Sequence, residues 1–265
     1  MVFAGDMVDI VPMGKLESRL DLARSRDTLC ASQRGRGRGK TRGTPQWRFS
    51  GLDARNQLMA KSETIRVLLI RSGATQWDEA GRLAGDTDLP LCDLGKAAVQ
   101  EQLGELNGTP ISVLLTAPDE ASVATAEVFA EATGAKVKKL ADLAEVDLGL
   151  WEGLRPEDLE EKYPTVFRQW LDDPGSVNAP EGESMADASE RITRELAKVA
   201  VKFKDDGQAV GIILRPMALA LIRGWLDNTP TTEFWRVVKE GSGAEWRTIP
   251  RATFLAAKER VRAEA

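Results

Sequence analysis

Short continuous runs of apolar residues alternate with helix-like segments from Ile65 onward, and this alternation constrains the fold more than any other feature. Runs such as Arg66–Ile70 are typical of strands that are buried on both faces of a parallel sheet. We predict strands at Arg66–Ile70, Ser112–Thr116, Ala135–Leu140, Val210–Leu214 and Glu245–Ile249. Strands that alternate with helices predict an α/β fold, in which helices cover both faces of a mainly parallel sheet as a three-layer αβα sandwich.

The segments between these strands carry helix signals. The clearest helix begins after Ser184, which can cap it together with Asp187 three residues later. Its apolar residues recur at steps of three and four and form one stripe, at Met185, Ala188, Ile192, Leu196, Val199 and Phe203. We expect this helix to end at Asp205-Asp206-Gly207. We also predict helices at Asp93–Leu106, Asp119–Thr133 and Met217–Leu226, and two short helices over Pro156–Asp172 that are broken at Tyr163-Pro164.

The first 60 residues differ from the rest of the chain. They carry a net charge of +5, whereas residues 61–265 carry −10. The Arg/Gly run at residues 34–43 is basic and of low complexity, so we expect residues 1–60 to be a disordered extension. Such a run could also make a weak contact with RNA. An alternative is that translation starts at Met59, directly ahead of a domain at residues 61–265.

The composition of the chain bears on whether it contacts nucleic acid or a membrane, and on the compartment in which it works. The acidic body repels nucleic acid and membrane phosphates. Cys30 and Cys92 lie in segments of different character, which predicts no structural disulfide and a reducing compartment. No apolar run reaches the roughly 18 residues that span a bilayer, and the N-terminus shows no signal-peptide pattern. We therefore expect a cytoplasmic protein with no membrane contact, and leave its oligomeric state open.

Arginines occur in the turns that follow two of the predicted strands. Arg71 comes directly after the first strand, and Arg215 directly after the strand at Val210–Leu214. Ligands of such sheets bind beyond the carboxyl ends of the strands, so we expect both arginines at one sheet edge. Two guanidinium groups there could hold a phosphate or a carboxylate. The alternative is that each arginine pairs with a surface carboxylate.

Short motifs in a fixed order run from about residue 65 to residue 250. After the first strand come Arg71-Ser72-Gly73-Ala74-Thr75, then Trp77-Asp78, Gly81-Arg82, Asp88 to Gly95, Thr116-Ala117-Pro118, Thr125-Ala126-Glu127, Leu143 to Gly153, and Pro180 to Ser184. This series resembles the histidine phosphatase (phosphoglycerate mutase-like) superfamily, whose first motif is Arg-His-Gly-Glu-Thr. The resemblance implies a phosphoglycerate mutase-like fold and phosphatase or phosphomutase chemistry through a phosphohistidine.

The departures from the family pattern fall on its chemistry, because this chain contains no histidine. The resemblance places Ser72 at the phosphohistidine position, Arg215 at the second-histidine position and Glu145 at the acid–base position. The other pocket positions are Arg71, Arg82 and Asp78 around the phosphate, of which Asp78 replaces an asparagine, and Ala74 and Ala121, which replace a glutamate and an arginine. The resemblance implies no cofactor, and the chain has no His or Cys cluster with the spacing of metal ligands.

Phosphoryl transfer needs an activated nucleophile and positive charge around the transferred group. Without an imidazole to activate Ser72, we expect a catalytically inactive pseudophosphatase that binds a phosphorylated small molecule or a protein partner. Glu145 is then either a relic or a partner of Arg215 that closes the pocket, and Trp151-Glu152-Gly153 is a structural turn. Two alternatives stay open: an active phosphatase or phosphoglycerate mutase-like enzyme with a rearranged site, and an RNA-associated protein that acts through residues 34–43.

Overall fold

A five-stranded sheet forms the centre of the molecule. The computed structural model describes residues 64–200, 203, 208–241, 243–254 and 256. The strands are β1 (Thr64–Arg71), β2 (Ile111–Thr116), β3 (Lys136–Lys139), β4 (Ala209–Leu214) and β5 (Ala244–Pro250), in the order β3-β2-β4-β1-β5. The first four are parallel, and β5 pairs antiparallel with β1. All five predicted strands and the mainly parallel sheet are confirmed.

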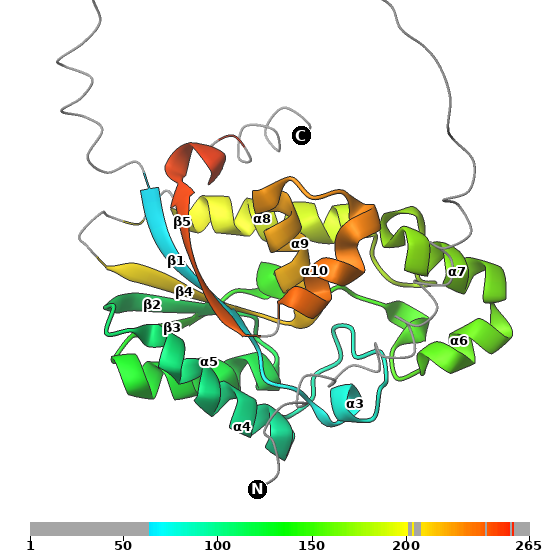
Figure 1. The fold of residues 1–265 in the computed structure, drawn as a ribbon, viewed down its shortest axis with the longest axis horizontal. Coiled ribbons are helices and arrows are strands. Elements are labelled where there is room, and N and C mark those ends of the chain that lie inside the picture. The colour runs from blue at the N-terminus through cyan, green and yellow to red at the C-terminus, as the bar shows by residue number, and fades with distance from the viewer. Residues whose placement is uncertain (1–63, 201–202, 204–207, 242, 255, 257–265) are drawn as a thin grey trace, which may run out of the picture.

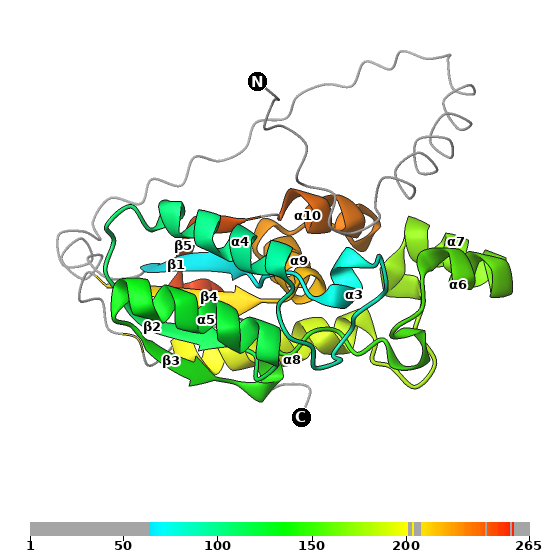
Figure 2. The ribbon, with the colours of Figure 1, turned by 90° about the horizontal axis from the view of Figure 1, so that it is seen from below.

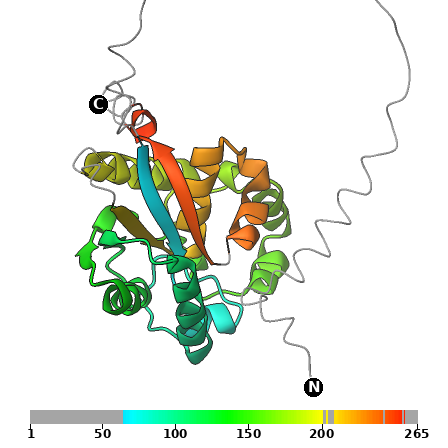
Figure 3. The ribbon, with the colours of Figure 1, turned by 60° about the vertical axis from the view of Figure 1, so that its left-hand side comes forward.

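Helices cover both faces of this sheet, which confirms the three-layer arrangement. One face carries α4 (Asp93–Gln102) and α5 (Glu120–Thr133), and the other carries α8 (Met185–Ala200), α9 (Pro216–Asp227) and α10 (Phe234–Glu240), as Figures 1 and 2 show. Figure 3 shows β1 and β5 running between the two helical layers. At one end lie α6 (Pro156–Lys162) and α7 (Pro164–Asp172), while α3 (Gln76–Glu79) follows β1 (Figure 1). Short 3-10 helices occupy Leu103–Leu106, Ala141–Leu143, Gly149–Trp151, Pro174–Ser176 and Thr231–Glu233.

Successive residues of β1 belong to two different hydrophobic cores. Val67 and Leu69 pack into the core with α8 and α9, whereas Leu68 and Ile70 pack with α4 and α5. None of these four residues is more than 2% exposed. Because side chains alternate across a strand, a stretch that is covered on both faces is apolar at consecutive positions, as Val67–Ile70 is.

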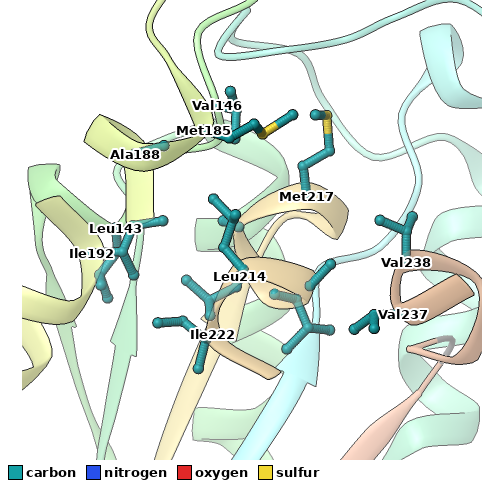
Figure 4. Close-up of a cluster of buried hydrophobic side chains, with 14 of the residues drawn as sticks. Leu143, Val146, Met185, Ala188, Ile192, Leu214, Met217, Ile222, Val237 and Val238 are labelled. Carbon is teal, nitrogen blue, oxygen red and sulfur yellow. The ribbon is translucent and has the colours of Figure 1, made fainter. Parts of the chain in front are cut away.

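The core between the sheet and α8–α10 includes the carboxyl end of β4. Figure 4 shows Leu214 of β4 and Ile222 of α9 in its middle, with Ile192 of α8 on one side and Val237 and Val238 of α10 on the other. The apolar stripe predicted for α8 faces this core. All of its members within the helix are buried: Met185, Ala188, Ile192, Leu196 and Val199.

The ends of the helices follow the capping signals in most places. Asp187 N–H donates to Ser184 Oγ at 3.0 Å, which confirms the predicted cap of α8. In a full capping box the Asp187 carboxylate would accept from the backbone N–H of Ser184, whereas here it accepts from the Ser184 hydroxyl (2.6 Å). The helix predicted over Asp93–Leu106 is α-helical only as far as Gln102 and continues as a 3-10 turn that contains Gly104. Glycine weakens a helix, and Asn107 ends the turn in the left-handed region (φ 48°).

Some predictions fall outside the described residues. These are the extension at residues 1–60, its Arg/Gly run at residues 34–43, the alternative start at Met59, and the helix end at residues 205–207. Among the helices that the structure describes, none is both long enough and apolar enough to cross a bilayer.

Candidate functional site

The carboxyl ends of β1 and β4 bring Arg71, Ser72 and Arg215 to one edge of the sheet. Arg71 is in register with Leu214, and Ser72 N–H donates to the Leu214 carbonyl at 2.9 Å. Because Arg215 follows Leu214 directly, Ser72 and Arg215, which the resemblance places at the two histidine positions, leave neighbouring strands side by side. The predicted meeting of Arg71 and Arg215 at one sheet edge is therefore confirmed.

Gly73 lets the turn after β1 pass close under α4. A Cβ atom at this position would lie 2.6 Å from Leu91 Cδ2 and 2.8 Å from the Gly95 carbonyl oxygen, closer than real Cβ contacts. The Gly73 N–H donates to Thr125 Oγ1 on α5 at 3.0 Å. Contacts with two helices thus fix the direction in which the chain leaves Ser72.

Asp78 joins α3 to Arg215. Its Oδ2 accepts from the N–H and the hydroxyl of Thr75, both at 2.7 Å, and so forms a capping box at the start of α3. The same oxygen lies 3.4 Å from Nη2 of Arg215. Both side chains are buried, and the second arginine of the site is therefore neutralised within the protein.

Glu145 caps the N-terminus of α9. Its Oε2 accepts from Met217 N–H at 2.8 Å, and its Oε1 accepts from Ala218 N–H at 2.6 Å and from Val146 N–H at 2.8 Å. Helix α9 starts with Pro216, which lacks an N–H, so Met217 and Ala218 present its first free amide donors. A buried carboxylate of the chain itself occupies the place where a helix N-terminus would bind an anion.

Burial raises the pKa of Glu145 to about 7, although Arg215 and the three backbone N–H groups act to lower it. The neutral and charged forms of this carboxyl are therefore close in free energy near neutral pH. Arg215 makes its hydrogen bond with Asp78 and acts on Glu145 through its charge. The predicted pairing of Glu145 with Arg215 is therefore wrong, because the carboxylate in direct contact with Arg215 is that of Asp78.

Arg71 is the least engaged cation of this cluster. Its only hydrogen bond from the guanidinium to another described residue is a long one, from Nη1 to the Val238 carbonyl at 3.5 Å. Burial lowers the pKa of Arg71, and the nearby charge of Arg215 adds to this effect, whereas Asp78 and Glu145 oppose it. The charges of Asp78, Glu145 and Arg215 thus all act on Arg71.

Ser72 is buried without a hydrogen-bond partner for its hydroxyl. The residue is 4% exposed, and Ser72 Oγ contacts no donor or acceptor among the described residues at hydrogen-bonding distance. A serine nucleophile needs an adjacent base to take its proton. In the part of the chain that the structure describes, no base stands next to this hydroxyl.

Arg82 lies outside this cluster of contacts. Its side chain is exposed, and Nη1 donates to the carbonyl of Gly153 at 2.5 Å. The structure thus uses Arg82 to join the loop after α3 to the turn at residues 151–153, and its role in phosphate binding stays a prediction. The expected structural turn is confirmed, because Trp151 is buried and stacks edge-to-face on Trp170 at 5.6 Å.

Sequence reasoning missed a clamp that holds the Glu145 loop. Arg191 on α8 donates to the carbonyls of Asp142, Ala144 and Glu145 at 3.0–3.2 Å and pairs with Glu183. Glu183 also accepts from Asp147 N–H at 3.1 Å. The motif at Pro180 to Ser184 contains Glu183, but only the fold shows that Arg191, two turns into the helix, reaches back over this loop.

A second missed residue is Glu152, which orders the loop after Arg82. Its Oε1 accepts from the N–H groups of Asp86 at 2.8 Å and Leu148 at 3.2 Å, and its Oε2 accepts from the Thr87 hydroxyl. Burial, and then the charge of Glu152, raises the pKa of Asp86 to about 6.

No group of three or more Asp, Glu, Cys or His side chains within the described ranges could hold a metal ion.

The family is decided by a match over most of the described chain. Residues 67–246 match the model of the histidine phosphatase superfamily, branch 1. The chain belongs to this superfamily. It is 28% identical to phosphoserine phosphatase 1 of Hydrogenobacter thermophilus over 171 aligned residues. The alignment covers 64% of this chain and 80% of that protein. It is 35% identical over 134 residues to a probable phosphoglycerate mutase, GpmB, of Klebsiella pneumoniae, covering 50% of this chain and 62% of that one.

A solved structure has the same fold as this member of the superfamily. Bacillus stearothermophilus YhfR superposes with a TM-score of 0.60 at 22% sequence identity, over 64% of this chain and 84% of that one. This likeness shows the phosphoglycerate mutase-like fold. The candidate site holds a serine, two arginines and two carboxylates, in a chain without histidine.

Proposed function

We propose that this member of the histidine phosphatase superfamily is a pseudophosphatase that binds a phosphorylated ligand without turning it over. The observation that carries the proposal is the isolated Ser72 hydroxyl, which stands where the family pattern places its phosphohistidine. A hydroxyl without a neighbouring base is a poor nucleophile at neutral pH. With no imidazole in the chain, no other side chain offers the family's route of phosphoryl transfer.

The use of the two carboxylates supports this proposal. The oxygens of Glu145 are committed to the backbone of α9 and of Val146, and not to a ligand. Asp78 pairs with Arg215, which removes most of the positive potential that the second arginine would add. Catalysis of phosphoryl transfer depends on preorganised positive charge, and these contacts leave Arg71 as its main source.

Ligand binding is favoured because the hydrogen-bond donors of Arg71 are largely unused within the described chain. The guanidinium makes one long hydrogen bond to a described residue, and the hydroxyl of the neighbouring Ser72 has no hydrogen-bond partner. An arginine fork and a hydroxyl are both donors for a phosphate oxygen. The relatives are named for phosphoserine and phosphoglycerate, so these two phosphorylated carboxylates are the ligands to try first.

A thermal-shift titration tests this binding. The full chain is heated with inorganic phosphate, phosphoserine or 3-phosphoglycerate, in parallel with Arg71→Ala and with Arg66→Ala as the matched control. Arg66 lies near the amino end of β1 and stacks on Trp246, away from the candidate site. At a ligand concentration of 100 times Kd, wild type and Arg66→Ala should gain about 2.7 kcal/mol, and Arg71→Ala should gain nothing. Equal gains in all three proteins, or none in wild type, would contradict binding at Arg71.

A cytoplasmic location and an RNA contact through residues 34–43 stay predictions. The first is supported by Cys92, a buried free thiol, as expected for a reducing compartment. Fractionation of the cells that produce the protein tests the location. RNA binding that is lost when residues 1–58 are removed would support the second.

A further inference from the structure

A cavity of about 480 Å³ lies in the helical layer that contains α8–α10, and it is separate from the cluster around Ser72. It is lined by the turn at Pro174–Ser176, the first turns of α8, the second half of α9, the connection to α10, and α10 itself. Ligand pockets in proteins usually span about 300–1,000 Å³. The candidate phosphate site lies at the opposite, N-terminal end of α9, so the two sites share a helix but no lining residue.

The floor of this cavity is apolar and fixed. It is formed by Met185 of α8, Leu221 of α9, and Phe234 and Val237 of α10, all of which are buried members of the main core. Figure 4 shows Met185 and Val237 within the packing around Leu214 and Ile222. Trp225 lines the cavity as well and packs against Phe254, with ring centroids 5.8 Å apart. These contacts leave a preformed apolar surface with an aromatic wall.

The rim of the cavity is polar and carries one charge. Among the described residues that line it, Asp173 is the only one with an ionisable side chain, and none is a lysine or an arginine. Asp173 Oδ1 accepts from the Thr231 hydroxyl at 2.6 Å and from Gly175 N–H at 3.1 Å, which fixes the carboxylate at the rim. Both of these hydrogen bonds go to Oδ1, and Oδ2 makes none to a described residue. One carboxylate oxygen is therefore held in place and open to a ligand.

We propose that this cavity binds a small molecule with an apolar, preferably aromatic, body and one ammonium group. The body would pack on the buried floor beside Trp225, and the ammonium would pair with Asp173 Oδ2. A single fixed negative charge favours a cation, and the lack of basic residues disfavours phosphorylated ligands. This site therefore differs in ligand chemistry from the phosphate site of the proposed function and does not depend on it.

Gly224 allows the cavity to be filled without disturbing the fold. It lines the cavity from α9, and a Cβ added there would have only the Thr229 carbonyl oxygen within 4 Å, at 3.9 Å. Its backbone is not in the left-handed region, so a larger residue is compatible with the helix. Gly224→Leu should fold and occupy the space. Gly104→Leu, at an exposed glycine with nothing within 4 Å of the added Cβ, is the matched control.

Isothermal titration calorimetry with three probes of the same shape tests the proposal: 1-naphthylmethylamine, 1-naphthalenemethanol and 1-naphthoate. At pH 7 the amine should bind to the full chain and to Gly104→Leu with the same affinity, about tenfold or more tighter than naphthoate. Gly224→Leu should abolish binding of all three probes. Asp173→Asn keeps the Oδ1 acceptor and should remove the preference for the amine over the neutral alcohol.

Each of the following outcomes would overturn the proposal. One is that the amine binds Gly224→Leu as tightly as wild type, which would place the probe elsewhere. Another is that naphthoate binds as tightly as the amine, or that Asp173→Asn leaves the preference intact, which would remove the role of the carboxylate. The last is that no probe binds the folded wild-type protein up to millimolar concentration. Because Arg71 is not a lining residue of this cavity, these results can be told apart from those for the phosphate site.

Discussion

Arg215 and Asp78 form a buried ion pair across the candidate site. Nη2 of Arg215 lies 3.4 Å from Oδ2 of Asp78, and the two side chains are 4% and 10% exposed. The resemblance places these residues where the family has its second histidine and an asparagine that faces the phosphate. At these two positions the chain therefore makes a buried contact between two of its own charged side chains.

Removing one partner of this pair should destabilise the fold strongly. Asp78→Ala leaves the Arg215 guanidinium buried without its counter-charge and also removes the cap of α3, so we expect a loss of about 3–5 kcal/mol in the free energy of unfolding. Replacing both residues, as in Asp78→Asn with Arg215→Met, should restore a large part of this loss. Urea denaturation measures both values. A loss below about 1 kcal/mol for Asp78→Ala would mean that the pair is not buried in solution.

The raised pKa of Glu145 predicts a dependence of stability on pH. Its pKa is about 7 in the fold, against an ordinary value of 4.5 for a glutamate side chain, so the folded state holds a proton that the unfolded state has lost between these two values. The contribution of Glu145 to stability should therefore fall as the pH rises from about 4.5 to 7, by up to roughly 3 kcal/mol.

The comparison with Glu145→Gln isolates this effect. Glutamine does not titrate, and Asp86, whose pKa is also raised, is present in both proteins and cancels in the difference. The difference in unfolding free energy between wild type and Glu145→Gln, measured from pH 5 to 8, should shift in favour of the glutamine variant as the pH rises. A difference that does not change with pH would show that Glu145 titrates normally.

The Arg191 clamp should contribute far more to stability than an ordinary surface arginine. Arg191→Ala leaves the carbonyls of Asp142, Ala144 and Glu145 without their donor and breaks the pair with Glu183, so we expect a loss of about 2–4 kcal/mol. Arg194→Ala, one turn away on α8, breaks only an exposed pair with Glu190 and should change stability by less than about 0.5 kcal/mol. Similar losses in both variants would argue against the clamp.

Much of the fold could be predicted because its signals are local. The strands are continuous apolar runs, and the breaks at Tyr163 and Gly134 follow from proline and glycine chemistry. The edge of the sheet at which Arg71 and Arg215 meet follows from the rule for parallel strands. What could not be predicted depends on which side chains meet across the fold. The partner of Arg215 was open between Glu145 and a surface carboxylate, and only the packing of α3 against the site selects Asp78.

The same limit applies to the residues that hold the site. The clamp formed by Arg191 joins α8 to a loop 46 to 49 residues earlier, and no periodicity in the sequence reports such a contact. Arg82 was predicted at the phosphate because its motif matches the family, whereas its observed contact is with Gly153. Short elements such as α3 and α10 were also missed, since four- and seven-residue helices have too few turns to show a pattern.

Gly149 should tolerate substitution much less than Gly134, although both have positive φ. At Gly149 (φ 47°) a Cβ would lie 2.3 Å from the Pro180 carbonyl oxygen, whereas at Gly134 (φ 71°) it would meet nothing within 4 Å. Gly134→Ala should thus lose about 1 kcal/mol from backbone strain alone. Gly149→Ala must in addition separate the loops at residues 149 and 180, with a loss of about 3 kcal/mol or more. Equal melting temperatures for the two variants would contradict this packing.

The most direct test of the account is the release of inorganic phosphate by purified protein from p-nitrophenyl phosphate, phosphoserine and 3-phosphoglycerate. The isolated Ser72 hydroxyl and the engaged Glu145 carboxylate predict no release above that of a Ser72→Ala, Glu145→Gln double variant prepared in the same way. Turnover by wild type that disappears in this double variant, with a phosphoryl group trapped on Ser72, would show that the site is an active phosphatase.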